Sequence, residues 1–168
     1  MSKLIKNGAL AADTWTLLTL AEGETPEAVA LPSGDLIVPL AVWQARKTEL
    51  ANRPSLGLLL EPADDVATVA KELQHFAVIA VRFPKFVDGR GYSTATLLRT
   101  RYGYTGELRA VGDVLIDQLF FYQRCGFDAY ALRDDKSVES ALARLTPFPD
   151  RYQTSVDTPA PLFRRRAA

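Results

Sequence analysis

Short apolar runs alternate with helical patterns of apolar residues through the middle of the chain. Short segments rich in apolar residues, which suit strands, occur at 77–81, 107–111 and 127–132. Apolar residues at helical spacing follow them at 93–102, 114–125 and 138–145. The run at 77–81 is continuously apolar, as in a parallel strand that is covered on both faces. The pattern therefore predicts three consecutive strand-then-helix units between about His75 and Ala143.

A fourth unit of the same kind precedes these three, with an apolar run at 56–60 and helical spacing at 66–73. Such alternation is typical of βαβ units and of a parallel sheet. Four units are half of an eight-unit barrel, and right-handed crossovers put their helices on one side of the sheet. We expect an α/β fold of consecutive βα units that form a small parallel, half-(β/α)-barrel-like sheet with a short N-terminal β element. A doubly wound open sheet is the alternative.

The first 54 residues follow a different pattern. Strands are expected there at 14–20 and 36–40, and a short helix at 43–50. Pro39 cannot donate to a sheet ladder, so the second of these strands suits an edge. We expect one domain, 1–168, in three parts: the N-terminal β element and short helix (1–54), the βα repeat core (55–146) and an irregular, Pro-rich tail (147–168).

Composition removes several classes of function. Twenty basic and twenty acidic side chains cancel, so no global charge favours nucleic acid or an anionic membrane as a partner. No apolar run approaches the roughly 20 residues that span a bilayer. The single Cys125 fits a reducing cytoplasm and suits a buried, inert thiol. With His75 as the only histidine, we expect neither a metal site nor a Cys–His nucleophile.

The loop after the second core strand, residues 82–93, carries the most candidate chemistry. Sites in parallel α/β folds lie beyond the carboxyl ends of the strands, where basic residues near a helix N-terminus suit an anion. Arg109 and Asp113 come from the next unit. The candidate anion-binding residues are Arg82, Lys85, Asp88, Arg90, Tyr92, Ser93, Arg109 and Asp113. Ser93 is also expected to cap the following helix.

Each of these residues has a structural explanation as well. Asp88 can close a turn, Arg109 can sit in an internal ion pair, and Asp113 can be an ordinary N-cap. Arg99 and Arg101 are expected to be solvated helix surface. The helix predicted at 114–125 is apolar over more than one stripe, which favours deep burial, a docking surface or a homodimer.

Several segments together resemble a known bacterial family. They are Phe-Pro-Lys-Phe at 83–86, Asp-Gly-Arg-Gly-Tyr-Ser at 88–93, Leu-Leu-Arg at 97–99, Gly-Glu-Leu-Arg-Ala-Val-Gly-Asp-Val at 106–114, Asp-Gln at 117–118 and Arg-Cys-Gly-Phe-Asp at 124–128. The sequence is similar, over about Val78 to Asp135, to the domain of unknown function 934. Members of that family are typically encoded beside sulfite reductase and the adenylyl-sulfate reductases, and often carry the label of an oxidoreductase in sulfite reduction.

The resemblance implies cytoplasmic sulfate assimilation, and it supplies no catalytic residues. We therefore expect an accessory protein of assimilatory sulfate or sulfite reduction that binds a small oxyanion or docks on sulfite reductase or another enzyme of the pathway. One alternative is an oxidoreductase with a loop-bound flavin, although the sequence has no dinucleotide fingerprint, cluster ligand set or redox-active cysteine pair. The other is a purely structural interaction protein. Whether the protein is an enzyme, and which cofactor it uses, stay open.

Overall fold

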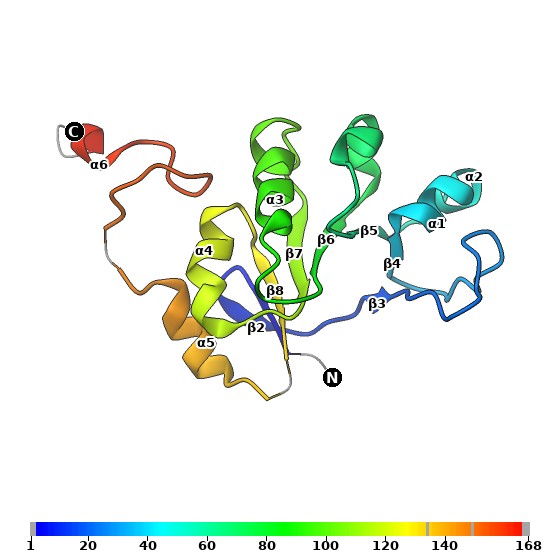
Figure 1. Ribbon diagram of the computed structural model, residues 1–168, viewed down its shortest axis with the longest axis horizontal. Helices are drawn as coiled ribbons and strands as arrows, with labels where there is room; N and C mark the ends of the chain where they lie inside the picture. The colour runs from blue at the N-terminus through cyan, green and yellow to red at the C-terminus, as the bar shows by residue number, and fades with distance from the viewer. Residues whose placement is uncertain (1–2, 134, 149, 166–168) are drawn as a thin grey trace.

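A computed structural model of the chain describes residues 3–133, 135–148 and 150–165. One sheet contains eight strands in the order β2-β1-β8-β7-β6-β5-β4-β3 (Figure 1). The strands are β1 (Lys3–Lys6), β2 (Ala9–Ala11), β3 (Thr16–Leu17), β4 (Leu36–Pro39), β5 (Leu56–Leu60), β6 (Val78–Phe83), β7 (Glu107–Gly112) and β8 (Ala129–Leu132). The helices are α1 (Leu40–Ala45), α2 (Lys47–Leu50), α3 (Arg90–Thr100), α4 (Leu119–Arg124), α5 (Val138–Leu145) and α6 (Leu162–Arg165), with 3₁₀ helices η1 (Val66–His75) and η2 (Ile116–Gln118).

The predicted α/β half-barrel is confirmed, with one correction. Strands β3 to β8 are parallel and lie in sequence order, without the reversal of a doubly wound sheet. The sheet is mixed, however, because β1 runs antiparallel to β8, with Ile5 opposite Tyr130, and β2 runs antiparallel to β1. The N-terminal β element therefore supplies both edges of the same sheet. Strands β1 and β2 were not expected from the sequence, because three or four residues are too few to indicate a strand or its partners.

The two edges of the sheet are joined by a very short piece of chain. Residues 12–15, the linking segment, run from β2 at one edge to β3 at the other. Seven strand spacings of about 4.8 Å would separate the edges of a flat sheet by about 34 Å. Five residue steps span at most about 18 Å. The sheet must therefore curl, and Figure 1 shows this dark-blue segment running along the side opposite α1 and α3.

The two faces of the sheet bury different residues. On the helix side, Ile79, Val81 and Phe83 of β6 join the large core together with residues of α3 and α4. On the opposite side, which we call the inner face, a smaller apolar cluster contains Val78 and Ala80. Alternation along each strand thus divides a continuously apolar strand between two packed layers, as the run at 77–81 predicted.

Several local elements differ from the sequence expectations. The strand expected at 14–20 is reduced to two residues, Thr16–Leu17. The helix predicted at 114–125 divides into the short η2 and α4, and the helix after β5 is a 3₁₀ helix capped by Asp65, whose carboxylate accepts from the Ala67 N–H at 2.9 Å. Ser137 caps α5, because its side chain accepts from the Ser140 N–H. Among the described residues, no helix is both long enough and apolar enough to cross a membrane.

Candidate functional site

The loop from β6 to α3 begins with an ion pair. Arg82, near the end of β6, donates from Nε to Oε1 of Glu61 at 2.7 Å. Glu61 immediately follows β5, so the pair joins the carboxyl ends of two neighbouring parallel strands. Both side chains are partly exposed. The first basic residue of the predicted anion loop is therefore already neutralised by a carboxylate.

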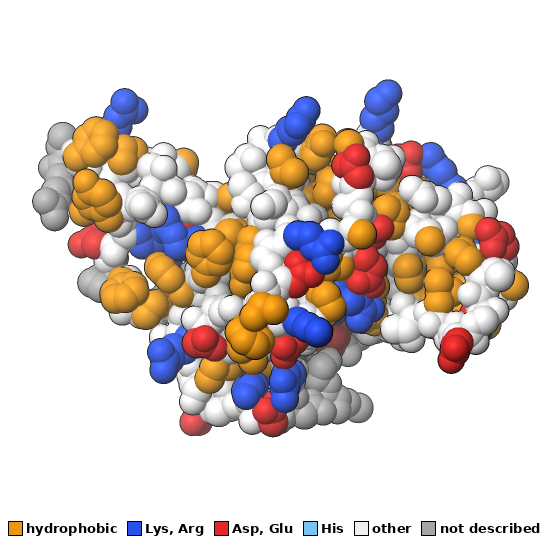
Figure 2. All heavy atoms as spheres, viewed as in Figure 1, with side chains coloured by type: hydrophobic (Ala, Val, Ile, Leu, Met, Phe, Trp, Pro, Cys, Tyr) orange, Lys and Arg blue, Asp and Glu red, His pale blue; other side chains and the backbone are white. Residues whose placement is uncertain are grey.

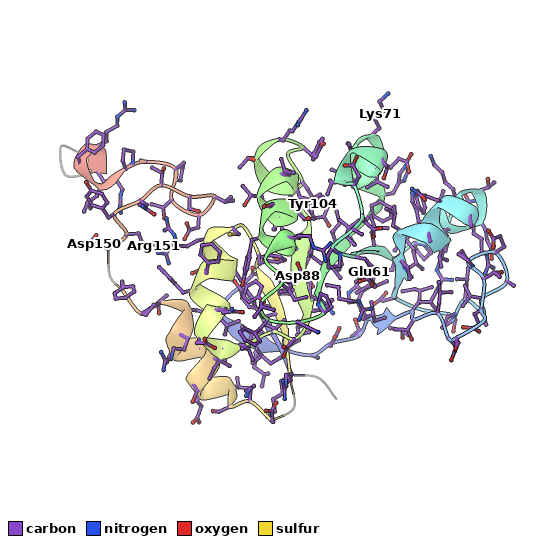
Figure 3. All side chains as sticks on the ribbon, viewed as in Figure 1. Glu61, Lys71, Asp88, Tyr104, Asp150 and Arg151 are labelled. Atoms are coloured by element: carbon purple, nitrogen blue, oxygen red, sulfur yellow. The ribbon has the colours of Figure 1, made fainter. Side chains whose placement is uncertain are left out.

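The second arginine of this loop is paired within the loop itself. Arg90 donates from Nη2 and Nε to the two carboxylate oxygens of Asp88 at 2.7 and 3.0 Å, and the Arg90 backbone N–H also points to Asp88. The Arg90 guanidinium holds the pKa of the Asp88 carboxyl below its usual range. Figure 3 labels Asp88 beside the start of α3 and Glu61 beyond the end of β5. Within the described chain, the exposed Lys85 side chain has no carboxylate partner.

Tyr92 and Gly91 have packing roles. The Tyr92 ring lies 5.1 Å from the ring of Phe83 and 4.7 Å from that of Phe121, and burial raises the pKa of its hydroxyl. A Cβ at Gly91 would lie 2.6 Å from Cζ of Phe83, so this glycine makes room for an aromatic ring. Ser93 is exposed inside α3, which begins at Arg90 after Gly89, so the predicted cap at Ser93 is wrong.

Arg109 occupies the inner face of β7 with only 2% of its surface exposed. Its Nε donates to Oε1 of Glu107 at 2.7 Å, and its Nη1 donates to Oδ1 of Asp13 at 2.8 Å. Glu107 is also paired with Lys6 of β1 at 2.7 Å. The internal ion pair that the sequence left open is thus present, and one of its carboxylates comes from the linking segment, 96 positions away.

Asp113 joins two loops at the carboxyl ends of the strands. Its Oδ2 accepts from the Phe86 N–H at 3.0 Å, and its Oδ1 accepts from Nη1 of Arg133 at 3.1 Å. The next helix, η2, begins at Ile116 without a side-chain cap, so Asp113 is not the N-cap that the sequence suggested. Arg133, which follows β8, also contacts Asp135.

A pocket of about 460 Å³ opens on the inner face, at the carboxyl ends of β7 and β8. Among the eight predicted site residues, only Arg109 lines it. The other lining residues include Asp13, Trp15, Val111, Ala131 and Arg133. Sequence reasoning missed Asp13 and Trp15, because nothing local shows that residues between two short strands cross the inner face. Within the described part of the chain, no group of three or more His, Cys, Asp or Glu side chains is placed to hold a metal ion.

A second feature of this end of the molecule is an exposed apolar surface. Phe86 and Val87 of the β6–α3 loop are 47% and 70% exposed, and Phe121 of α4 is 52% exposed. The Gln118 side chain donates to the Phe86 carbonyl at 3.4 Å, which links the loop to the start of α4. Figure 2 shows hydrophobic side chains exposed over this region, with charged side chains between them. We call Phe86, Val87 and Phe121 the Phe121 patch.

The comparisons with known proteins identify a family and no individual relative. No curated protein and no solved structure matches the chain. A family model described as a bacterial protein of unknown function matches residues 57–163, which run from within β5 to within α6 and include both the ion-paired loop and Arg109. That match spans well over half of the sequence. The chain therefore belongs to the bacterial family of unknown function named DUF934.

Proposed function

We propose that this protein is an accessory protein of assimilatory sulfate or sulfite reduction that docks on sulfite reductase through the Phe121 patch. The pathway comes from the family resemblance, because genes of this family typically stand beside sulfite reductase. A cytoplasmic location is part of the same proposal. The docking mode comes from the arrangement of the β6–α3 loop and α4.

The exposed Phe121 patch is the observation that carries the docking proposal. The loop's charged side chains are largely satisfied within the protein, through Arg82–Glu61 and Arg90–Asp88. The same loop leaves Phe86 and Val87 exposed near the start of α4, the helix that carries the exposed Phe121, which costs free energy in a free monomer. Aromatic side chains in a patch with a polar rim are typical of the centre of a protein–protein interface.

Binding of a small oxyanion at the β6–α3 loop, the second candidate function, has less support from these contacts. An oxyanion at the loop would have to share Arg90 with Asp88 or Arg82 with Glu61, whose carboxylates already neutralise these arginines, or rely on Lys85 alone. Thermal unfolding in millimolar sulfite or sulfate tests this second candidate directly, since a bound ligand raises the melting temperature by mass action. If Arg90→Ala abolished this rise in melting temperature, the anion would bind at the loop.

Co-purification tests the docking proposal. Tagged protein is expected to retain sulfite reductase from cells that express both, and Phe121→Glu is expected to abolish this retention. A charge in the centre of an apolar interface typically costs several kcal/mol of binding free energy. Phe163→Glu is the matched control, because Phe163 is 71% exposed in the distant helix α6.

The outcomes separate docking from self-association. Size-exclusion chromatography of the wild type and of Phe121→Glu shows whether the patch joins two copies of this chain. A dimer that Phe121→Glu converts to a monomer, with no retention of sulfite reductase by the wild type, would assign the patch to a homodimer and reject the docking proposal.

A further inference from the structure

We propose that the inner-face pocket binds a planar cyclic amide, a flat ring in which a carbonyl stands next to an N–H. The ring would lie along Trp15, with its amide edge against Arg109 and Asp13. This site is separate from the Phe121 patch and does not depend on the docking proposal. Unused hydrogen-bonding atoms at the pocket wall support it.

Arg109 brings an unused donor to the pocket. Its Nε and Nη1 each donate to a carboxylate, whereas no acceptor among the described residues lies against Nη2. The side chain is 3% exposed, and the residue lines the pocket. Because Nη2 is open to the pocket rather than fully enclosed, water can reach it there, and a ligand that supplies an acceptor can take the place of that water.

Asp13 brings an unused acceptor next to that donor. Both the Arg109 Nη1 and the Trp15 backbone N–H donate to the same oxygen, Oδ1, at 2.8 and 3.2 Å. No donor in the described chain reaches Oδ2. The ion pair between Arg109 and Asp13 is therefore monodentate. It leaves Nη2 of Arg109 and Oδ2 of Asp13 as a neighbouring donor and acceptor. The carbonyl and N–H of a cyclic amide are complementary to this pair.

The charges around Arg109 favour a neutral ligand. Lys6, Glu107, Arg109 and Asp13 form a chain of ion pairs with two positive and two negative members. An added carboxylate or sulfate would place a third negative charge among them, unless it first displaced Asp13. Arg133, the other basic residue of the pocket wall, is already paired with Asp113 and Asp135. A neutral amide edge can use both free atoms without disturbing the chain.

The walls of the pocket suit a flat, largely apolar body. Trp15 is half-buried, and Leu17, Val111 and Ala131 supply apolar surface around it. A volume of about 460 Å³ accommodates a ring system of two or three fused rings and lies in the usual range for small-molecule sites. The class includes pyrimidine, pterin and flavin rings. If the protein binds a flavin, we therefore expect the flavin ring in the inner-face pocket and not at the loops.

Nuclear magnetic resonance of the two tryptophan indoles tests the proposal on the full chain, with 2-quinolone as the probe. Trp15 lines the pocket, whereas Trp43 is 1% exposed in the helix-side core and donates from Nε1 to Glu72. The probe is expected to shift the Trp15 indole signal to saturation and to leave the Trp43 signal unchanged. Absence of any Trp15 shift at millimolar probe overturns the proposal.

A matched ligand and a matched variant sharpen the result. Coumarin keeps the shape and the carbonyl but has a ring oxygen in place of the N–H, and it is expected to bind about tenfold more weakly, as for one lost hydrogen bond in a buried site. Ala131→Leu fills the pocket from β8 and is expected to abolish the shift, while an unchanged Trp43 signal reports the intact fold. Equal binding of the two ligands, or displacement of the probe by inorganic sulfate, would overturn the assignment of a neutral amide.

Discussion

The guanidinium of Arg99 lies 2.7 Å from the carboxylate of Asp128 and ties α3 to the segment that precedes β8. The same guanidinium donates to the carbonyls of Tyr104, Gly106 and Gly126 at 2.7, 2.8 and 2.9 Å. Asp128 in turn accepts from the Leu108 N–H of β7 at 2.8 Å. The expectation that Arg99 is solvated helix surface is therefore wrong, because its side chain is 14% exposed and joins several segments.

Replacing Arg99 is expected to destabilise the fold. Arg99→Ala removes the partner of Asp128 and leaves three carbonyls without their donor, so we expect a loss of about 2 kcal/mol or more in the free energy of unfolding. Arg101→Ala is the control, because Arg101 is exposed and has no carboxylate partner among the described residues. Urea denaturation measures both variants. Equal stabilities would mean that the Arg99 contacts contribute nothing.

Asp128 is expected to make stability depend on pH. Burial is the largest influence on its carboxyl and raises the pKa above the ordinary 3.8. The folded state then holds this proton more tightly than the unfolded state, so the carboxyl's contribution to stability falls as pH rises from 3.8 through the raised pKa, and is constant above it. Asp128→Asn lacks this titration. The wild-type free energy of unfolding minus that of the variant should decrease as pH rises through this window, and an increase would contradict the prediction.

Gly112 is expected to tolerate no side chain. Its φ is +96°, and a Cβ would lie 2.4 Å from the carbonyl oxygen of Phe83, which already accepts from the Asp113 N–H. Gly34 has a similar φ of +86° but open space around it. Gly34→Ala should cost about 1 kcal/mol from backbone strain alone. Gly112→Ala should lower the free energy of unfolding clearly more, since the ends of β6 and β7 must also separate. Thermal melts of the two variants compare them directly.

Cys125 is expected to react slowly in the native protein. Its side chain is buried, and burial raises the pKa of the thiol, so little thiolate is present at neutral pH. Alkylation by iodoacetamide, followed by mass spectrometry, should be slow in buffer and fast in denaturing urea. Fast modification in buffer alone would show that the end of α4 opens readily.

The repeat core could be predicted from sequence because its signals are local. The segments that became β6, β7 and β8 are rich in apolar residues, and each is followed by apolar residues at helical spacing. The N-terminal strands could not be placed in this way. β1 has only four residues, and its position depends on Tyr130 and its neighbours, which lie more than a hundred positions away. Propensity cannot choose between edges of a sheet.

In the candidate site, too, contacts between residues close in sequence could be predicted, and contacts between distant residues could not. The acid that neutralises Arg90 is two positions away, so a local ion pair could be weighed from the sequence. The partner of Arg109 in the linking segment could not be foreseen, and neither could the pocket that it helps to form, because both arise only when the sheet curls. Arg99 was misjudged because helical spacing does not show that the chain after β7 returns beneath α3.

The linking segment also fixes the order in which the chain can assemble. β1 and β2 leave the ribosome before the other strands of the sheet, but β1 has no neighbour except β2 until β8 has been synthesised. A nascent chain that ends before residue 129 can pair its central strands. Its β1–β2 hairpin then has no partner strand in the sheet. Pairing β1 with β8 closes a loop of more than a hundred residues, and the contacts of the completed sheet are needed to offset the entropy that this costs. Docking of the N-terminal strands should therefore be the last step of folding, and it creates the inner-face pocket as it occurs.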